Sequence, residues 1–255
     1  MAVEGATPAS SPREVAERSE VIVTVVTDTP DVQQVLLGKN GVVDGLRTDT
    51  VVIDTNTIFP TATREMADTI QQKGAYMLDA PVSGGEGGAI AGTLSIMVRG
   101  NEAIFNYCLP IFEVMGKNIV PLGGTGSGQL TKLCNRIAVA ATNLAMSEAS
   151  IFGAKAGINL KKMQQAISGG ATGSWRLAKL APRIPERDFA PGFMAELQHE
   201  DLCLVLQEAD HLKLALPATS LVHHFFHPLE TRGARGEGTQ AIVKVLEQLV
   251  GVTLK

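Results

Sequence analysis

Residues 20–54, with the sequence EVIVTVVTDTPDVQQVLLGKNGVVDGLRTDTVVID, decide the fold class of this protein. The stretch holds a β-branched run at residues 21–26, then a polar and helical segment, then a second β-branched run at residues 51–54. Short runs of this kind are typical of buried strands, and a helical segment between two of them is typical of a β-α-β unit. We therefore predict two strands joined by a helix in this stretch.

The same alternation continues beyond residue 54. A helix is predicted from about residue 60 to residue 73, a strand near residues 76–79 and a further strand at residues 94–98. Alternating strands and helices are the pattern of α/β proteins, in which helices cover a parallel sheet. The first half of the chain is therefore predicted to be a doubly wound, Rossmann-like parallel sheet.

A glycine-rich segment at residues 123–128 marks the predicted domain boundary, which gives a first domain of residues 1–125 and a second of residues 126–255. Helical spacing of apolar residues begins at Leu130 and continues to Phe152. Further helical patterns follow, broken by glycines and prolines, and they predict an all-helical second domain. These patterns cover residues 160–167, 193–209 and 239–249.

Composition argues against several classes of partner. The 255 residues include 45% hydrophobic and 19% charged residues, with a net charge of -4, and the basic residues are dispersed rather than clustered against a phosphate backbone. We expect no nucleic-acid partner. No uninterrupted apolar stretch reaches the roughly 18 residues of a membrane span, and Met1 is not followed by a signal-peptide pattern. We therefore expect a cytoplasmic protein with no membrane partner.

The cysteines and histidines give no metal site by their spacing. Three cysteines without a Cys-x-x-Cys pair indicate neither a disulfide framework nor a thiolate zinc site. His223 and His227 are one helical turn apart, a spacing that can bind zinc, with His224 beside them. Because no third ligand or H-E-x-x-H frame lies nearby in the sequence, we expect no metal and assign these histidines to a helix surface or a subunit contact.

A first candidate motif directly follows the strand predicted at residues 76–79. It reads Asp79-Ala80-Pro81-Val82-Ser83-Gly84-Gly85 and continues with glycines to residue 94. Glycines after a strand let backbone N–H groups turn toward an anion, and a serine hydroxyl adds a donor for a carboxylate. A glycine-rich turn without a ligand explains the same pattern when it is considered alone.

A second candidate motif covers residues 126–135, GSGQLTKLCN. Lys132 lies in the first turns of an apolar helix, and Asn135 follows it by one turn on the same face. A lysine at such a position reaches either solvent or a ligand. Together, the two motifs supply an anion-binding loop and a helix-borne lysine, which are the groups needed to reduce a small carbonyl compound that bears a carboxylate.

On these motifs, the sequence from residue 5 to residue 249 resembles the β-hydroxyacid dehydrogenase family. Residues 54–58, DTNTI, are similar to the strand-end motif that the family places near the nicotinamide, and residues 169–175 and 189–193 are similar to its helical domain. The resemblance implies hydride transfer between NAD or NADP and the carbinol carbon of a short 3-hydroxy acid, or the reverse reduction of its semialdehyde.

The resemblance also implies a role for individual residues. Lys132 is expected to be the general acid or base on the substrate hydroxyl. Ser83, Gly84 and Gly85 are expected to hold the carboxylate of the substrate, and Asn135 to orient the lysine or the substrate. At the cofactor, the resemblance implies contacts with the residues that follow two strands, namely Val26, Thr27 and Thr57.

The family also uses its long interdomain helix, here residues 130–156, in the subunit interface. The resemblance therefore implies a homo-oligomer, although a core helix would show the same amphipathic periodicity.

The sequence departs from the family at the phosphate loop. The family opens with a strand, a G-x-G-x-x-G loop and a helix that together hold the pyrophosphate, and no such segment precedes residue 20. We therefore expect a truncated sheet and weakened dinucleotide binding. The alternative function is that of a cofactor-free remnant that oligomerises or binds small acids. An imine reductase is less favoured, because Lys132 is retained.

Two charged residues also depart from the family pattern. Glu200 occupies the place of a lysine that helps line the site, and Arg136 follows Asn135 where the family has Asn or Gln. One hypothesis is that Arg136 and Glu200 form an ion pair that restores neutrality. The alternative is that the two changes are independent and lie on the surface.

Overall fold

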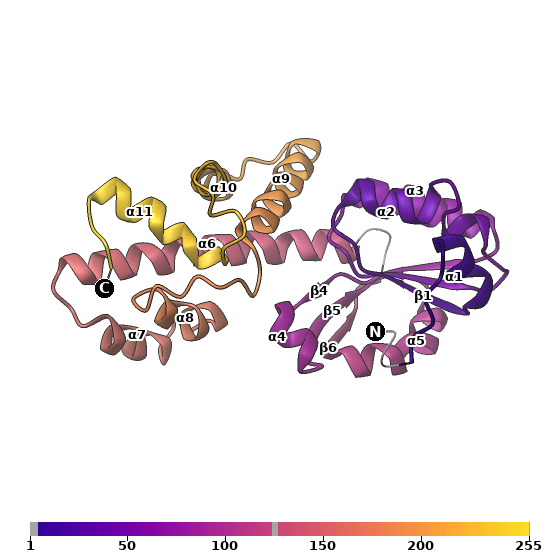
Figure 1. Cartoon of the computed structure of the whole chain (residues 1–255), viewed down its shortest axis with the longest axis horizontal. Helices are drawn as coiled ribbons and strands as arrows, with labels where there is room; N and C mark the ends of the chain where they lie inside the picture. Colours follow the sequence, from indigo (N-terminus) through magenta and orange to yellow (C-terminus); the bar gives the residue numbers. More distant parts are fainter. Residues whose placement is uncertain (1–4, 124–126, 255) are drawn as a thin grey trace. The chain divides into compact units, whose positions relative to one another are not determined.

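The computed structural model describes residues 5–123 and 127–254. The chain divides into two compact units, Met1–Lys132 and Leu133–Lys255. Helix α6 (Ser127–Lys155) carries residues of both units, and each unit is described below by itself (Figure 1).

A parallel sheet forms the centre of the first unit. Strands β1 (Val21–Thr24), β2 (Val51–Asp54) and β3 (Tyr76–Asp79) pair in the order β1-β2-β3. Helix α2 (Thr29–Leu37) follows β1, and helix α3 (Pro60–Gln72) joins β2 to β3. The predicted β-α-β unit is confirmed.

Side-chain caps mark the starts of the first two helices of this unit. The side chain of Asp28 accepts a hydrogen bond from the backbone N–H of Asp31 and so caps α2, which has a proline in its first turn. A helix absent from the prediction, α1 (Pro12–Arg18), is capped in the same way by Ser11, whose hydroxyl accepts from Glu14 N.

The strand predicted at residues 94–98 lies in a second, mixed sheet rather than in the first parallel one. Strand β5 (Leu94–Val98) pairs antiparallel with β4 (Val82–Ser83) and parallel with β6 (Gly116–Pro121). Only the short helix α4 (Gly85–Ile90) separates β4 from β5. A parallel crossover needs about a dozen residues or more, so this short connection returns the chain antiparallel. An isolated bridge between Asp79 and Arg99 links the two sheets.

Both faces of β2, the central strand of the parallel sheet, are buried, which agrees with the predicted doubly wound architecture. On β2, Val52 belongs to one apolar cluster, with residues of α2 and α3. Its neighbours Val51 and Ile53 belong to a second cluster, which includes Phe112 of helix α5 (Glu102–Met115). Successive side chains of a strand point to opposite faces, so a run without polar residues suits a strand that is covered on both sides.

In the described residues after Leu133, the second unit contains helices and no named strand, as predicted. Its buried apolar cluster draws on α6 and on the helices that follow it. These are α7 (Leu160–Ser168), α8 (Trp175–Lys179), α9 (Ala195–His211), α10 (Pro217–Thr231) and α11 (Val243–Val250), with 3-10 turns at Ala181–Arg183 and Thr239–Ile242.

Among the described residues, α6 has the length and apolar composition of a membrane span. The core helix of a protein without a membrane passes the same test, and 44% of the apolar window of α6 is buried inside the structure. The buried residues of α6 also include polar ones, among them Gln129, Asn143 and Ser147. The observation is weak evidence for a membrane, and the expected absence of a membrane partner stays a prediction.

Candidate active site

Polar side chains gather where the three parallel strands end. Asp54, the last residue of β2, is fully buried, and its Oδ1 atom accepts hydrogen bonds from Thr24 Oγ1 at 2.7 Å and from Asn56 Nδ2 at 2.5 Å. Asn56 Oδ1 accepts in turn from the backbone N–H of Val26 at 2.7 Å. These bonds tie the segment after β1 to the segment after β2, at the edge where open α/β sheets bind their ligands.

The first turn of α6 joins the same network through Gln129. Its backbone N–H donates to Asp79 Oδ2 at 3.0 Å, and its side-chain N–H donates to Asp79 Oδ1 and to the carbonyl of Asn56, both at 2.9 Å. Its side-chain oxygen accepts from the backbone N–H of Ile58 at 3.0 Å. One buried amide therefore anchors the start of α6 to the ends of β2 and β3.

Glycine at position 128 permits this close approach. A Cβ atom built there would lie 2.5 Å from Asp79 Oδ2 and 3.0 Å from the backbone oxygen of Asp79. We expect Gly128→Ala to lower the free energy of unfolding by about 1–3 kcal/mol, because the helix start must move away from β3. Gly87→Ala in α4 is the matched control, since no atom lies within 4 Å of its added Cβ. Urea unfolding compares the two variants, and equal effects would contradict the close approach.

Burial perturbs both strand-end carboxyls. It raises the pKa of Asp54 from 3.8 to about 6, against the opposing hydrogen bonds of Thr24 and Asn56. It raises the pKa of Asp79 to about 7, with the charge of Asp54 adding to the effect and the bonds from Gln129 opposing it. Among the described residues, no hydrogen-bond donor reaches Asp54 Oδ2. The Asp54 and Asp79 side chains together therefore favour a total charge of zero or minus one over a state in which both are ionised.

The raised pKa of Asp54 predicts a pH-dependent stability. Between about pH 4 and pH 7 the folded chain binds more protons than the unfolded chain, so its free energy of unfolding falls as the pH rises through this window. Asp54→Asn removes one of the two titrations. We expect the stability difference between Asp54→Asn and the wild type to shift in favour of the variant by on the order of 3 kcal/mol from pH 4 to pH 8. Urea unfolding across this range measures it, and parallel profiles would contradict the assignment.

Lys132 lies one helical turn after Gln129 on α6, which brings it to the same side of the helix. Its side chain is 1% exposed, and its ammonium group donates a hydrogen bond to the carbonyl of Val82. Val82 and Ser83 form β4, which leads directly into Gly84 and Gly85. The structure therefore brings the predicted catalytic lysine to the predicted carboxylate loop.

The loop itself adopts a backbone that favours glycine. Gly84 has a φ of 142° and Gly85 a φ of 64°, conformations that residues with a Cβ rarely adopt. A Cβ atom at Gly84 would also lie 3.0 Å from the side chain of Leu94. The turn thus depends on the two glycines that the sequence pattern singled out.

The remaining predicted site residues lie on neighbouring segments. Val26 and the exposed Thr27 follow β1, and the partly buried Thr57 follows β2, so all three are at the ligand-binding edge of the sheet. Asn135 is partly buried and lies one turn beyond Lys132 on α6. The sequence analysis did not predict the network of Asp54, Asp79 and Gln129. The sequence feature that could have indicated it is that two adjacent strands both end in an aspartate.

The structure pairs Arg136 with a carboxylate other than the hypothesised Glu200. In the second unit, Arg136 Nε lies 2.5 Å from Asp201 Oδ2, and its guanidinium lies 4.1 Å from the ring centroid of Phe193. Arg136 is 9% exposed and Asp201 5%, so the pair is buried rather than on the surface. Adjacent positions on a helix are rotated by about 100°, so the pairing of Asp201 with Arg136 directs Glu200 to another side of α9.

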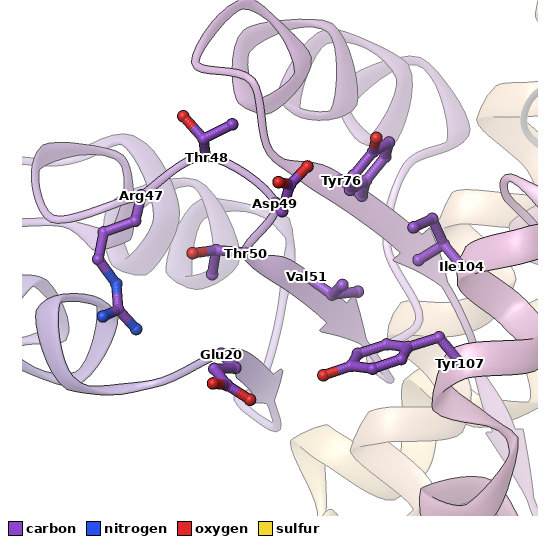
Figure 2. Close-up of a pocket in the computed structure, with 9 residues that line it drawn as sticks. All are labelled: Glu20, Arg47, Thr48, Asp49, Thr50, Val51, Tyr76, Ile104 and Tyr107. Carbon is purple, nitrogen blue, oxygen red and sulfur yellow. The ribbon is translucent and has the colours of Figure 1, made fainter.

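A hollow of about 560 Å³ opens at the other edge of the parallel sheet (Figure 2). Its lining includes Glu20, Val51 and Tyr76, which lie at the amino ends of β1, β2 and β3, together with Tyr107 of α5. Ligands of open α/β sheets bind at the carboxyl ends of the strands. The network around Asp54 and Lys132, rather than this hollow, is therefore the candidate active site.

Two protein-family models match the chain. The one described as the NAD binding domain of 6-phosphogluconate dehydrogenase matches residues 1–124. The one described as NAD-binding of NADP-dependent 3-hydroxyisobutyrate dehydrogenase matches residues 126–246. Family models described as binding NAD therefore match residues 1–124 and 126–246 of the chain.

Similar proteins include relatives named as reductases or dehydrogenase-like proteins, and solved structures. The chain is 41% identical over 243 residues to 2-hydroxy-3-oxopropionate reductase of Escherichia coli, a match covering 95% of this chain and 83% of the relative. It is 40% identical over 252 residues to the probable 3-hydroxyisobutyrate dehydrogenase-like protein 1, mitochondrial, of Arabidopsis thaliana, covering 98% of this chain and 75% of the relative. The 3-hydroxyisobutyrate dehydrogenase of Mycobacterium tuberculosis, solved with L-serine, superposes with a TM-score of 0.84 at 28% identity, covering 93% of this chain and 83% of that chain.

Proposed function

Because the chain belongs to the β-hydroxyacid dehydrogenase family of NAD(P)-dependent oxidoreductases, we propose that it interconverts a short 3-hydroxy acid and its semialdehyde. The proposed substrates are of the 3-hydroxyisobutyrate or tartronate semialdehyde class. The observation that carries the proposal is the buried ammonium of Lys132 beside the Ser83–Gly84–Gly85 turn.

Lys132 is the proposed acid and base. Oxidation of an alcohol to a carbonyl requires removal of the hydroxyl proton, and the reverse reduction requires its return. The carbonyl of Val82 accepts a hydrogen bond from one of the three N–H groups of the ammonium, which fixes the direction of the side chain. The same carbonyl precedes Ser83, so the lysine is held to the segment that is proposed to bind the substrate.

The turn after β4 is the proposed carboxylate site. The Ser83 hydroxyl and the backbone N–H groups of Gly84 and Gly85 are donors, and donors suit an anion. A substrate whose carboxylate binds this turn and whose hydroxyl reaches Lys132 would be only a few bonds long. L-Serine, present in the solved structure of the Mycobacterium tuberculosis relative, is itself a short 3-hydroxy acid.

The nicotinamide cofactor, when bound, accepts or supplies the hydride. The described residues fit its nicotinamide end, because Val26, Thr27 and Thr57 follow two parallel strands at the ligand-binding edge. The hydrogen bond from Val26 N to Asn56 Oδ1 keeps these two segments together. Since the 255 residues hold no G-x-G-x-x-G segment, the proposal includes weakened dinucleotide binding by this chain.

Initial rates with a carboxylate substrate and with its uncharged amide analogue test the proposal. The chain is assayed with 3-hydroxyisobutyrate and with 3-hydroxyisobutyramide, each with NAD and with NADP at concentrations set by a prior titration. We expect kcat/KM to be about 10- to 100-fold lower for the amide, because the turn loses its charged partner. Equal values would exclude the carboxylate site. No turnover of either compound with NAD or NADP, and none of tartronate semialdehyde with NADH or NADPH, by folded protein with bound cofactor, would support the non-catalytic alternative.

A further inference from the structure

Helices α9 and α10 of the second unit pack against each other (Figure 1), and four side chains of types that can bind metals meet between them. His199 and Cys203 are one turn apart on α9, and His223 and His227 are one turn apart on α10. Cys203 Sγ lies 3.3 Å from His223 Nε2. The ring centroid of His199 lies 4.5 Å from that of His223 and 4.4 Å from that of His227.

The ligand atoms of three of these residues lie close to the spacing of a metal site. One ligand atom each from His199, Cys203 and His223 lies within 4.8 Å of the other two. Around tetrahedral zinc, with bonds of about 2.0–2.3 Å, neighbouring ligand atoms are separated by roughly 3.3–3.8 Å. Small side-chain adjustments would therefore close the three ligands on one ion.

His199 has the second partner that metal-binding histidines usually have. Its Nδ1 atom lies 2.6 Å from Glu230 Oε1 on α10, while its Nε2 atom is buried and has no hydrogen-bond partner among the described residues. A carboxylate on one ring nitrogen orients the ring and leaves the other nitrogen as the metal donor. His199 is only 7% exposed, and an unpartnered nitrogen at such a depth is costly unless something binds it.

We propose that His199, Cys203 and His223 bind a divalent metal of the zinc class, with His227 beside them in the fourth position. A third ligand was not predictable from the spacing of His223 and His227, because His199 and Cys203 lie on a different helix. Thiolate and imidazole donors together favour zinc over hard cations such as magnesium or calcium. The ion would clamp α9 to α10, as structural zinc sites do.

The electrostatic surroundings favour the proposed ion in part and oppose it in part. Burial, together with the neighbouring histidines, lowers the pKa of His223 to about 4, which leaves its ring neutral at neutral pH. Burial raises the pKa of the Cys203 thiol, with the charges of Glu230 and Glu200 adding to the effect. Metal binding would therefore release the thiol proton, and the two carboxylates would offset part of the charge of the ion.

Cobalt(II) is the probe, because a tetrahedral cobalt thiolate absorbs visible light and has a sulfur-to-metal charge-transfer band. The untagged, full 255-residue chain is treated with a chelator, kept reduced and titrated with Co²⁺ alone, and Zn²⁺ is then added as a competitor. We expect saturation at one Co²⁺ per chain, appearance of the charge-transfer band and its loss on addition of Zn²⁺. A chain that shows no saturable band would overturn the proposal.

Matched variants locate the ion. Cys203→Ser should abolish the charge-transfer band, and Glu230→Gln, which keeps every direct ligand, should weaken binding by about 10- to 100-fold. Cys134→Ser at an exposed cysteine and His211→Gln at the end of α9 should bind cobalt like the wild type. An unchanged band in Cys203→Ser, or equal losses in the two controls, would exclude this site. Because Glu230 is partly exposed, its variant remains informative if Cys203→Ser folds poorly.

Discussion

Replacing Lys132 by methionine is expected to lower kcat by about 10²- to 10⁴-fold, the usual contribution of one positioned acid or base. Methionine has a similar length and suits a buried position, so the substitution removes the proton donor with little change in volume. The hydrogen bond to the carbonyl of Val82 is lost as well. KM for the substrate should change much less than kcat, since Ser83 and the two glycines remain.

Lys155→Met is the matched control for this prediction. Lys155 lies at the other end of α6 and is exposed, so the same substitution there should leave kcat within about twofold, as at most surface positions. Steady-state rates of the wild type and both variants give the comparison, with circular dichroism to establish folding. A folded Lys132→Met variant with unchanged kcat would remove the lysine from the proposed chemistry.

Replacing Asp201 by alanine is expected to lower the free energy of unfolding by about 3–5 kcal/mol, because it leaves the buried Arg136 guanidinium without its partner. A second cation lies nearby. Burial and the charge of Arg136 together lower the pKa of Arg176 to about 10. Loss of Asp201 therefore removes the carboxylate that pairs with Arg136, while the charge of Arg176 stays close to Arg136. Urea unfolding of the variant measures the effect.

Double-mutant cycles compare the coupling of Arg136 to Asp201 with its coupling to Glu200, the residue next to Asp201 in the sequence. Arg136→Met combined with Asp201→Leu should be more stable than either single variant, because an apolar pair replaces the ion pair without an orphaned charge. The same cycle with Glu200→Gln should show a coupling below about 0.5 kcal/mol, a value typical of residues without a direct interaction. A larger coupling of Arg136 to Glu200 than to Asp201 would reverse the assignment.

Local sequence patterns were sufficient for most of the fold. The β-branched runs at residues 21–26 and 51–54 contain β1 and β2, and apolar residues lie on both faces of the central strand β2. The strand at residues 94–98 was located correctly, but its neighbours were not. The direction of β5 relative to β4 depends on the length of the connection between them, which the hydrophobic pattern of the strand does not contain.

The sequence also indicated the right segments for the candidate site, since the loop after β3 and the lysine of α6 are joined through Val82 and Lys132. Pairings between distant segments were not predictable in the same way. Gln129 binds Asp79 across 50 residues, and the pairs of α9 with α6 and α10 depend on helix packing. Helical spacing predicts which residues share a face, but not which other helix covers that face.

Transfer of deuterium from nicotinamide-labelled NADH and NADPH to tartronate semialdehyde tests the central claim most directly. The chain is used at high concentration with excess cofactor, so that even weak binding permits one turnover, and the product is analysed by mass spectrometry. We predict deuterium at the carbinol carbon of the product with the wild type, and at least about 100-fold slower labelling with Lys132→Met. If folded wild-type protein with measurable cofactor binding transfers no deuterium to this aldehyde or to the semialdehyde of 3-hydroxyisobutyrate, the proposed dehydrogenase chemistry is contradicted.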